Sequence, residues 1–437
     1  MAGQRAMAGL WLVLFLETAR RNMSLEFAGR RQYSYAQSST GSKKMSKNIV
    51  ICCDGTANQF AEARTNVIKL YYTLERDPAR QIAFYHPGVG TMEPVGALST
   101  PARKTTRVLG MAVGYGLSND IADAYTFLMN NYQDDDKVYV FGFSRGAYTA
   151  RAVCSLLRMY GLIHPDNGPL VPYAVRMMMA IGKLHGRSEA GKTPTKEEND
   201  AVENYFRLAD DFKQMMCRKG CTPYFVGVWD TVSSVGWKDN PLKLPFSADN
   251  PDIAIGRHAI AIDERRAFFR TNRWVPSALL KEHGPRDVKQ VWFAGVHCDV
   301  GGGYAEAESG LSKIALEWML EEAKANGLLV NNARQAEVLG LSPGSKYAKP
   351  DADACQHESL TGAWKMAELI RKPHYDWKTN TTTMRANEGR RRTIPPESLV
   401  HESVFRRHGG KYKDAAGIPA DAIPVATLRP ANAVSAS

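Results

Sequence analysis

The chain has 437 residues, 44% of them hydrophobic and 23% charged, which is typical of a soluble globular protein with a large core. Its formal net charge of +11 at pH 7 favours anionic partners such as a phospholipid membrane surface, although a basic, solvated surface is the simpler explanation. The basic residues are dispersed and form no cluster with aromatic residues, which argues against nucleic acid as a partner.

The N-terminal region does not predict a folded domain. Residues 6–16 are apolar but too few to span a bilayer, and residues 17–21 form a poor signal-peptide cleavage site. Because Met45 directly precedes the first convincing strand, we expect residues 1–46 to be a disordered leader or an extension from an upstream start codon. No later stretch is long and apolar enough for a transmembrane helix.

The seven cysteines have no regular spacing, and several lie in apolar stretches. This usage is typical of a reducing compartment, so we expect a cytoplasmic protein, with secretion left open. Cys217 and Cys221 could begin a metal site, but no second pair and no nearby histidine completes it, and we expect no bound metal.

The first part of the chain alternates between strands and helices. Apolar periodicity predicts strands at residues 48–53, 81–86 and 137–143 and helices at residues 65–74 and 117–129. This alternation is typical of right-handed βαβ units, so we expect an α/β fold with a mainly parallel central sheet flanked by helices.

Two alternative enzyme classes fail on single residues. A haloacid-dehalogenase phosphatase would have its nucleophilic aspartate where this chain has Cys52. A dinucleotide fingerprint would need a third glycine where this chain has Glu93. Both classes are therefore set aside.

A helical insertion is predicted over residues 164–221, with no evident strand, and it is either a lid over the substrate or a packing insertion. Beyond it we expect strands at residues 224–229 and 288–296, a charged helix at residues 257–266 and an amphipathic helix at residues 311–326.

The predicted domain organisation follows from these elements. A catalytic domain is expected over residues 47–330, and a peripheral C-terminal segment that packs on it over residues 331–414. Within that segment, residues 398–405 form a short ordered island. Residues 415–437 are expected to be a disordered tail.

The most informative stretch is the turn after the strand at residues 137–143. It contains Gly142-x-Ser144-x-Gly146, the nucleophile-elbow pattern, in which a strained strand-to-helix turn lifts a serine above the sheet. Small residues near the serine are required because a side chain there would crowd the neighbouring backbone. The apolar strand before Ser144 and the helix-forming residues after it are the context that the pattern requires.

Two further strands end in residues that could complete a catalytic triad. Asp230 follows the strand at residues 224–229, and His297 follows the strand at residues 288–296. Serine, acid, histidine is the chain order of α/β-hydrolases, in which histidine activates serine and the acid orients histidine. Backbone N–H groups of Arg145 and of the loop with Gly55 and Thr56 are the candidate oxyanion hole.

Each partner of Ser144 has a rival in the sequence. His401 comes later in the chain, where the base of such hydrolases is often found. Asp299 could replace Asp230 as the acid, or could instead hold its own loop by hydrogen bonds. The strong strand and the glycine turn beside His297 favour His297 as the base.

Four motifs in this order resemble a bacterial and fungal α/β-hydrolase family whose better-understood members are phospholipase effectors of type VI secretion. The motifs are residues 53–56, 142–148, 227–232 and 295–304, and the likeness covers residues 47–330. The resemblance implies an α/β-hydrolase fold and a Ser-Asp-His lipolytic hydrolase, with Ser144, Asp230 and His297 at the matching positions.

The function expected from the sequence is therefore hydrolysis of acyl esters, of lipids or phospholipids, through an acyl-serine intermediate without metal or organic cofactor. Peripheral contact with an anionic membrane would suit the net charge. Two alternatives stay open: an esterase or thioesterase for non-lipid acyl substrates, and a catalytically silent hydrolase-like interaction module.

Overall fold

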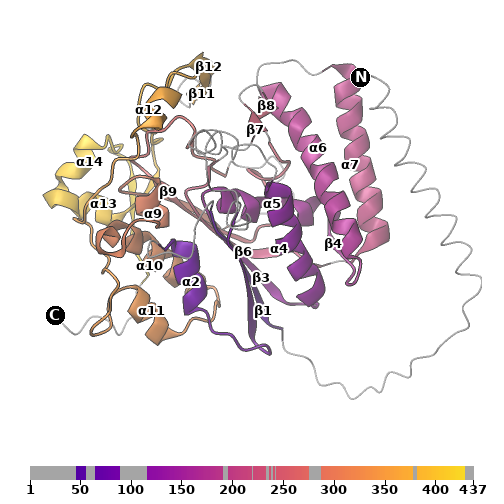
Figure 1. Cartoon of the computed structure of the whole chain (residues 1–437), viewed down its shortest axis with the longest axis horizontal. Helices are drawn as coiled ribbons and strands as arrows, with labels where there is room; N and C mark the ends of the chain where they lie inside the picture. The colour runs from indigo at the N-terminus through magenta and orange to yellow at the C-terminus, as the bar shows by residue number, and fades with distance from the viewer. Residues whose placement is uncertain are drawn as a thin grey trace, which may run out of the picture. The chain divides into compact units, whose positions relative to one another are not determined.

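The computed structural model describes residues 46–55, 64–88, 116–189, 195–218, 220–232, 236–237, 240–241, 243–274, 287–376 and 381–428 (Figure 1). The chain divides into two units, Met1–Lys44 and Met45–Ser437, and the described residues all belong to the second. The expected leader up to residue 45, Thr56 of the candidate oxyanion loop and the last nine residues of the tail, 429–437, lie outside the described residues.

One large sheet organises the unit. It has eight strands in the order β14-β13-β10-β9-β6-β3-β1-β2, and every neighbouring pair is parallel. The strands are β1 (Asn48–Cys53), β2 (Gln81–His86), β3 (Lys137–Phe143), β6 (Pro223–Trp229), β9 (Ile255–Ala261), β10 (Asp287–Phe293), β13 (Leu399–His401) and β14 (Ile423–Val425). A parallel sheet of this size with helices on both faces confirms the expected α/β-hydrolase-like fold.

Helices cover both faces of the sheet (Figure 1). The longer ones are α2 (Asn66–Thr73), α4 (Leu117–Asn131), α5 (Arg145–Tyr160), α6 (Val171–Glu189), α7 (Lys196–Met216) and α10 (Gly310–Ala325). The shorter ones are α9 (His297–Gly301), α11 (Asn332–Val338), α12 (Ala363–Ala367), α13 (Glu402–Arg406) and α14 (Lys411–Ala415). The helices predicted at residues 65–74, 117–129 and 311–326 are confirmed as α2, α4 and α10.

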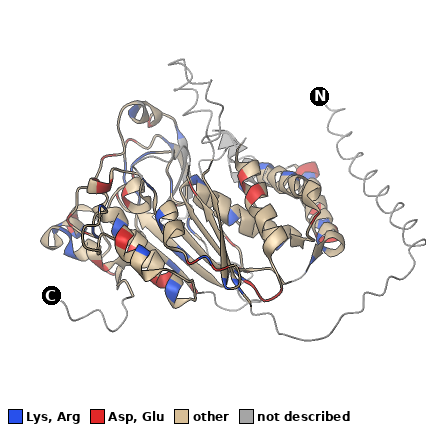
Figure 2. Ribbon diagram, turned by 60° about the horizontal axis from the view of Figure 1, so that its bottom comes forward, with Lys and Arg blue, Asp and Glu red and all other residues tan. Residues whose placement is uncertain are grey.

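Alternation along the strands divides the apolar core into two layers. Ile49 and Ile51 of β1 pack with α4, α5, α6 and α7, whereas Val50 and Cys52 pack with α2 and α10. Charged residues lie mainly on helices and loops, and the ribbon of the sheet is largely uncharged (Figure 2). Of the residues described, no helix is long and apolar enough to cross a bilayer.

The insertion after the elbow is largely helical, as predicted. It consists of α6 and α7, but β4 (Leu162–Ile163) and β5 (Cys217–Arg218) pair antiparallel at its base, where no strand was expected. Two other small antiparallel pairs lie outside the large sheet, β7 (Gly236–Trp237) with β8 (Asn240–Pro241) and β11 (Lys372–Asp376) with β12 (Thr381–Arg385).

The charged helix predicted at residues 257–266 is wrong, because these residues begin inside strand β9. All of β9 is buried, and its charged member Arg257 is paired with Glu322 of α10 (Nε to Oε2, 2.6 Å) and with Asp287 of β10 (Nη2 to Oδ2, 2.6 Å). Buried charges that are fully paired inside the fold look like surface charges in the sequence, and this produced the error.

The C-terminal part of the chain belongs to the core of the fold. Residues 331–414 were expected to be a peripheral segment that packs on the catalytic domain, but part of this segment, β13, belongs to the large sheet beside β10. The tail predicted to be disordered from residue 415 instead contains β14, the edge strand that pairs with β13.

Candidate active site

Ser144 lies on a strained turn between β3 and α5. Its backbone angles, φ 58° and ψ −121°, are rarely adopted by a residue with a side chain, and they are those expected of a nucleophile elbow. A Cβ atom on Gly142 would lie 2.4 Å from the carbonyl oxygen of Gly146, and one on Gly146 would lie 2.2 Å from that of Cys53. Both glycines of the pattern are therefore required by close backbone contacts, while Ser144 itself is only half-buried.

Asp230 and His297 form a buried hydrogen-bonded pair. Oδ2 of Asp230 lies 2.6 Å from Nδ1 of His297, and neither residue is more than 3% exposed. Asp230 follows β6, and His297 begins α9, four residues after the end of β10. Because β6 and β10 run parallel on either side of β9, their carboxyl ends bring the two side chains to the same edge of the sheet.

The serine turn contacts this pair through its neighbours. The backbone N–H of Ser144 donates to the carbonyl oxygen of Trp229 (3.1 Å), the residue before Asp230. The ring of Phe143, the residue before Ser144, packs on the imidazole of His297 with 4.6 Å between the ring centroids. Ser144, Asp230 and His297 are thus carried by three strand ends that are joined by direct contacts.

The guanidinium of Arg392 also binds the carboxylate of Asp230. Nη1 of Arg392 donates to Oδ1 of Asp230 (2.5 Å), Nη2 donates to Oδ2 (3.1 Å), and the backbone N–H of Ala261 also donates to Oδ1 (3.0 Å). Burial would raise the pKa of Asp230, but Arg392 and His297 outweigh burial and hold the pKa below its usual value. Asp230 is therefore ionised throughout the neutral range.

His297 is neutral at the same pH. Burial is the largest effect on its pKa and lowers it below the ordinary value, although the hydrogen bond to Asp230 acts in the opposite direction. A neutral imidazole whose Nδ1–H donates to a carboxylate presents Nε2 as an acceptor on the far side of the ring. This is the tautomer that a general base requires.

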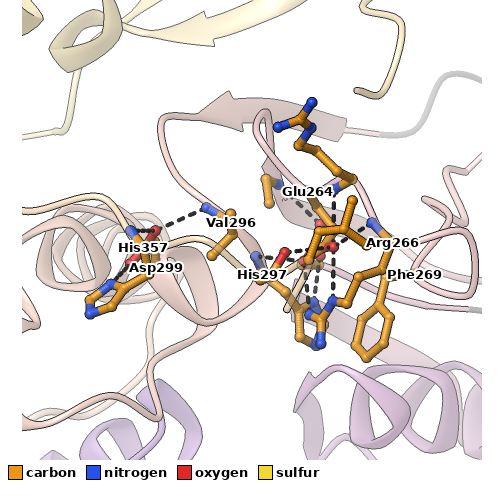
Figure 3. A network of polar contacts seen from close by, with 12 residues as sticks. Glu264, Arg266, Phe269, Val296, His297, Asp299 and His357 are labelled. Atoms are coloured by element: carbon orange, nitrogen blue, oxygen red, sulfur yellow. Dashed lines mark hydrogen bonds and ion pairs between the residues drawn. The ribbon is translucent and has the colours of Figure 1, made fainter. Parts of the chain in front are cut away.

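A second carboxylate fixes the backbone of the histidine (Figure 3). Oε2 of Glu264 accepts a hydrogen bond from the N–H of His297 (3.3 Å) and pairs with Nη2 of Arg266 (2.8 Å). Burial would raise the pKa of Glu264, but Arg266 outweighs it and lowers the pKa to about 2. The ring of Phe269 meets the imidazole edge-on at 4.8 Å and covers a further side of it.

The candidate oxyanion donors have different surroundings. Arg145 opens α5, where the helix dipole favours negative charge. Gly55 lies beside the elbow, since a Cβ atom on it would be 3.3 Å from Cβ of Ser144, but its N–H donates to Oδ1 of Asp54 (2.7 Å). Thr56 lies outside the described residues.

The structure places both rival residues in other contacts. His401 is buried between Ser403 Oγ (2.8 Å) and Thr427 Oγ1 (3.0 Å), and it caps α13. Oδ2 of Asp299 accepts from the N–H of Val296 (3.0 Å), and Oδ1 of Asp299 lies 2.6 Å from Nδ1 of His357 (Figure 3). Asp299 thus holds the start of α9, as the alternative interpretation of this residue anticipated.

Arg392, Glu264 and Phe269 are the residues of this site that sequence analysis missed. Arg392 is 162 positions from Asp230, in a loop rich in arginine and proline, and no local pattern distinguishes it from its neighbours. For Glu264 a signal existed, because it follows an apolar run that proved to be strand β9.

Several known proteins are similar to this chain. An uncharacterized protein of Saccharomyces cerevisiae is 30% identical over 237 residues, which are 53% of this chain and 33% of the yeast protein. Two solved structures each cover 65% of this chain. One is an uncharacterized protein from Pseudomonas aeruginosa, with 16% sequence identity, a TM-score of 0.33 and 46% of its own chain covered. The other is the Tle1 effector bound to the VgrG spike of the type 6 secretion system, with 17% identity, a TM-score of 0.34 and 57% of its own chain covered. The chain therefore spans a third to little more than half of these proteins.

A family model matches more than half of the chain. The family model for the catalytic domain of Tle1-like phospholipase effectors of type VI secretion matches residues 47–322. That range contains Ser144, Asp230 and His297 and ends before Arg392. By this match, the chain belongs to the family of Tle1-like phospholipase effector catalytic domains.

Proposed function

We propose that the chain is a serine hydrolase that cleaves acyl esters of lipids through an acyl-enzyme intermediate, with Ser144 as nucleophile, His297 as base and Asp230 as the orienting acid. The observation that carries the proposal is the buried Asp230–His297 pair at the sheet edge where the strained turn presents Ser144.

The proposed reaction uses each group in turn. Oγ of Ser144 attacks the acyl carbonyl carbon while Nε2 of His297 takes its proton, and Asp230 stabilises the imidazolium that forms. The tetrahedral oxyanion is held by the N–H of Arg145 and by the loop that follows β1. When the C–O bond breaks, His297 returns the proton to the leaving alcohol, and water repeats the sequence on the acyl-serine.

The backbone N–H of Gly55 already has a hydrogen-bond partner. Because the N–H of Gly55 is bonded to its neighbour Asp54, it can serve the oxyanion only if that bond is released. We therefore assign the second donor to the loop as a whole, and the first to Arg145.

A lipid substrate is supported by the family and by the surroundings of the histidine. The family is one of phospholipase effectors. The imidazole of His297 lies between the rings of Phe143 and Phe269, and Phe269 in turn contacts Trp364 at 5.3 Å. Apolar walls next to the base suit an acyl chain better than a polar substrate.

The proposal is tested by changing Ser144→Ala and measuring hydrolysis of a short p-nitrophenyl ester, with Ser342→Ala as the matched control at a half-buried serine outside the site. We expect turnover to fall by at least about four orders of magnitude, and labelling by a fluorophosphonate probe to be lost with it. Undiminished turnover in a folded Ser144→Ala protein would refute the mechanism, and failure of the unmodified chain to react with the probe would favour the silent interaction module.

The substrate class is tested with a panel of phospholipids, monoglycerides and acyl thioesters. The proposal expects the highest kcat/KM on phospholipid or another lipid ester. A preference for thioesters or for water-soluble acyl groups would contradict it and support a non-lipid hydrolase.

A further inference from the structure

Around helix α12 a carboxylate is buried and two large apolar side chains are exposed, which is the reverse of the usual arrangement. Glu368, directly after the helix, is 5% exposed, whereas Met366 and Leu369 are 75% and 76% exposed. Among the large apolar side chains described elsewhere, the exposed fraction does not exceed 54%, the value of Leu341. Since soluble proteins normally bury such side chains and expose carboxylates, this reversal indicates a surface that meets an apolar environment.

The reversal is fixed by hydrogen bonds of the buried carboxylate. Oε1 of Glu368 accepts from the N–H of Ala267 (2.6 Å), and Oε2 accepts from Nδ2 of Asn387 (2.7 Å) and from the N–H of Gly389 (3.0 Å). These contacts tie α12 to the body of the protein by its polar side. Met366 and Leu369 cannot turn inward without breaking them.

The hairpin next to α12 carries another exposed apolar side chain. Met384 of β12 is 50% exposed, and Nη2 of Arg371 donates to its carbonyl oxygen (2.7 Å), which joins the hairpin of β11 and β12 to the segment after α12. Figure 1 shows α12, β11 and β12 next to one another. Lys365, Arg371 and Arg385 are exposed within two positions of these apolar residues in the sequence. We call Met366, Leu369, Met384 and these three cations the α12 patch.

Helix α12 is connected to His297 by two edge-to-face ring contacts. Trp364 of α12 lies 5.3 Å from Phe269, and Phe269 lies 4.8 Å from His297. The guanidinium of Arg266 lies over both rings, at 3.5 Å from Phe269 and 5.2 Å from Trp364. A surface that receives the α12 patch therefore lies next to the site where its acyl esters would be cleaved.

We propose that the α12 patch docks the protein on an anionic lipid surface, with Met366, Leu369 and Met384 inserted among the acyl chains and Lys365, Arg371 and Arg385 at the headgroups. The occupant follows from the chemistry, because exposed apolar side chains that have cations beside them in the sequence match the layered polarity of an anionic membrane. The proposed function explains why docking would be useful to the protein, and the inference rests on it in that respect alone. Docking itself does not require catalysis.

The experiment measures binding of the full chain to phosphatidylcholine vesicles with and without phosphatidylserine, by co-sedimentation, in the Ser144→Ala background so that the lipid stays intact. The apolar half of the patch is removed by Met366→Ser with Leu369→Ser, and the charged half is reversed by Lys365→Glu with Arg385→Glu. Met215→Ser with Leu341→Ser is the matched control, since these side chains are 49% and 54% exposed on other elements.

We expect the apolar double variant to lower vesicle affinity at least tenfold, because each buried Leu or Met side chain contributes about a factor of ten. The charge-reversal variant is expected to lose roughly fivefold or more per cation, only on vesicles with phosphatidylserine. The control pair is expected to bind like the parent, and both patch variants with Ser144 restored are expected to keep the parent kcat/KM on a soluble ester.

The inference is overturned if the apolar double variant binds as tightly as the parent, or if phosphatidylserine does not increase binding of the parent. An equal loss of vesicle affinity in the Met215→Ser, Leu341→Ser control would also overturn it. Binding would then depend on the total exposed apolar surface of the protein and not on the α12 patch. These outcomes are separate from those of the proposed function, which fails if Ser144→Ala leaves soluble-ester hydrolysis intact, whatever the vesicles show.

Discussion

Arg392→Met should both destabilise the fold and change the pH dependence of activity. The Arg392 side chain is 9% exposed and that of Asp230 is fully buried, so the substitution leaves a buried carboxylate whose remaining side-chain partner is the neutral imidazole of His297. Breaking a buried ion pair from one side costs about 3–5 kcal/mol of unfolding free energy. For comparison, Arg390→Met removes an ion pair whose side chains are 50% and 62% exposed, and should cost about 1 kcal/mol or less.

The electrostatic effect on catalysis has a definite sign. Without Arg392, the charge of Asp230 acts on His297 alone and stabilises its imidazolium, so the pKa of His297 rises. The acid limb of the pH profile of kcat/KM should then move to higher pH by about one unit. Arg392→Lys keeps a positive charge but cannot donate two parallel hydrogen bonds, and should give a smaller shift.

Denaturant unfolding and the pH profile on a soluble ester measure the two effects independently. If Arg392→Met does not fold, Arg392→Lys supplies both measurements. A variant that unfolds like Arg390→Met and keeps the parent acid limb would refute the assignment of Arg392 as the residue that positions Asp230.

Two further predictions concern the base. Because burial lowers the pKa of His297, the unmodified enzyme should lose activity with an apparent pKa below 6.5 as the pH falls, and a pH profile of kcat/KM with its acid limb above 6.5 would contradict a buried neutral base. His401→Gln should lower the free energy of unfolding by about 1–2 kcal/mol, because it weakens the hydrogen bonds to Ser403 and Thr427, and it should leave kcat/KM unchanged. A loss of turnover comparable to that of Ser144→Ala would instead make His401 the base.

The parts of the fold that sequence analysis predicted are those with an uninterrupted local pattern. Residues 49–53 and 138–143 are continuous apolar runs, as strands buried on both faces must be, and they form nearly all of β1 and β3. The elbow around Ser144 was predictable because its glycines are required by contacts within a few residues of one another or with β1, the strand beside it.

The errors have a common physical cause, which is compensation between residues far apart in the sequence. Arg257 has the charge of a surface residue, and only its pairing with Glu322 and Asp287 makes burial in β9 possible. Arg392 likewise reaches Asp230 across 162 positions. A single sequence shows the need for such partners but not their identity.

The position of β13 and β14 at the end of the large sheet has a consequence for the order of assembly. A chain is synthesised from its N-terminus, so Ser144, Asp230 and His297 all emerge before Arg392 and before the last two strands. Until then Asp230 lacks its guanidinium and β10 has an open edge. The proposed triad of a nascent chain is therefore incomplete until Arg392, β13 and β14 have been synthesised.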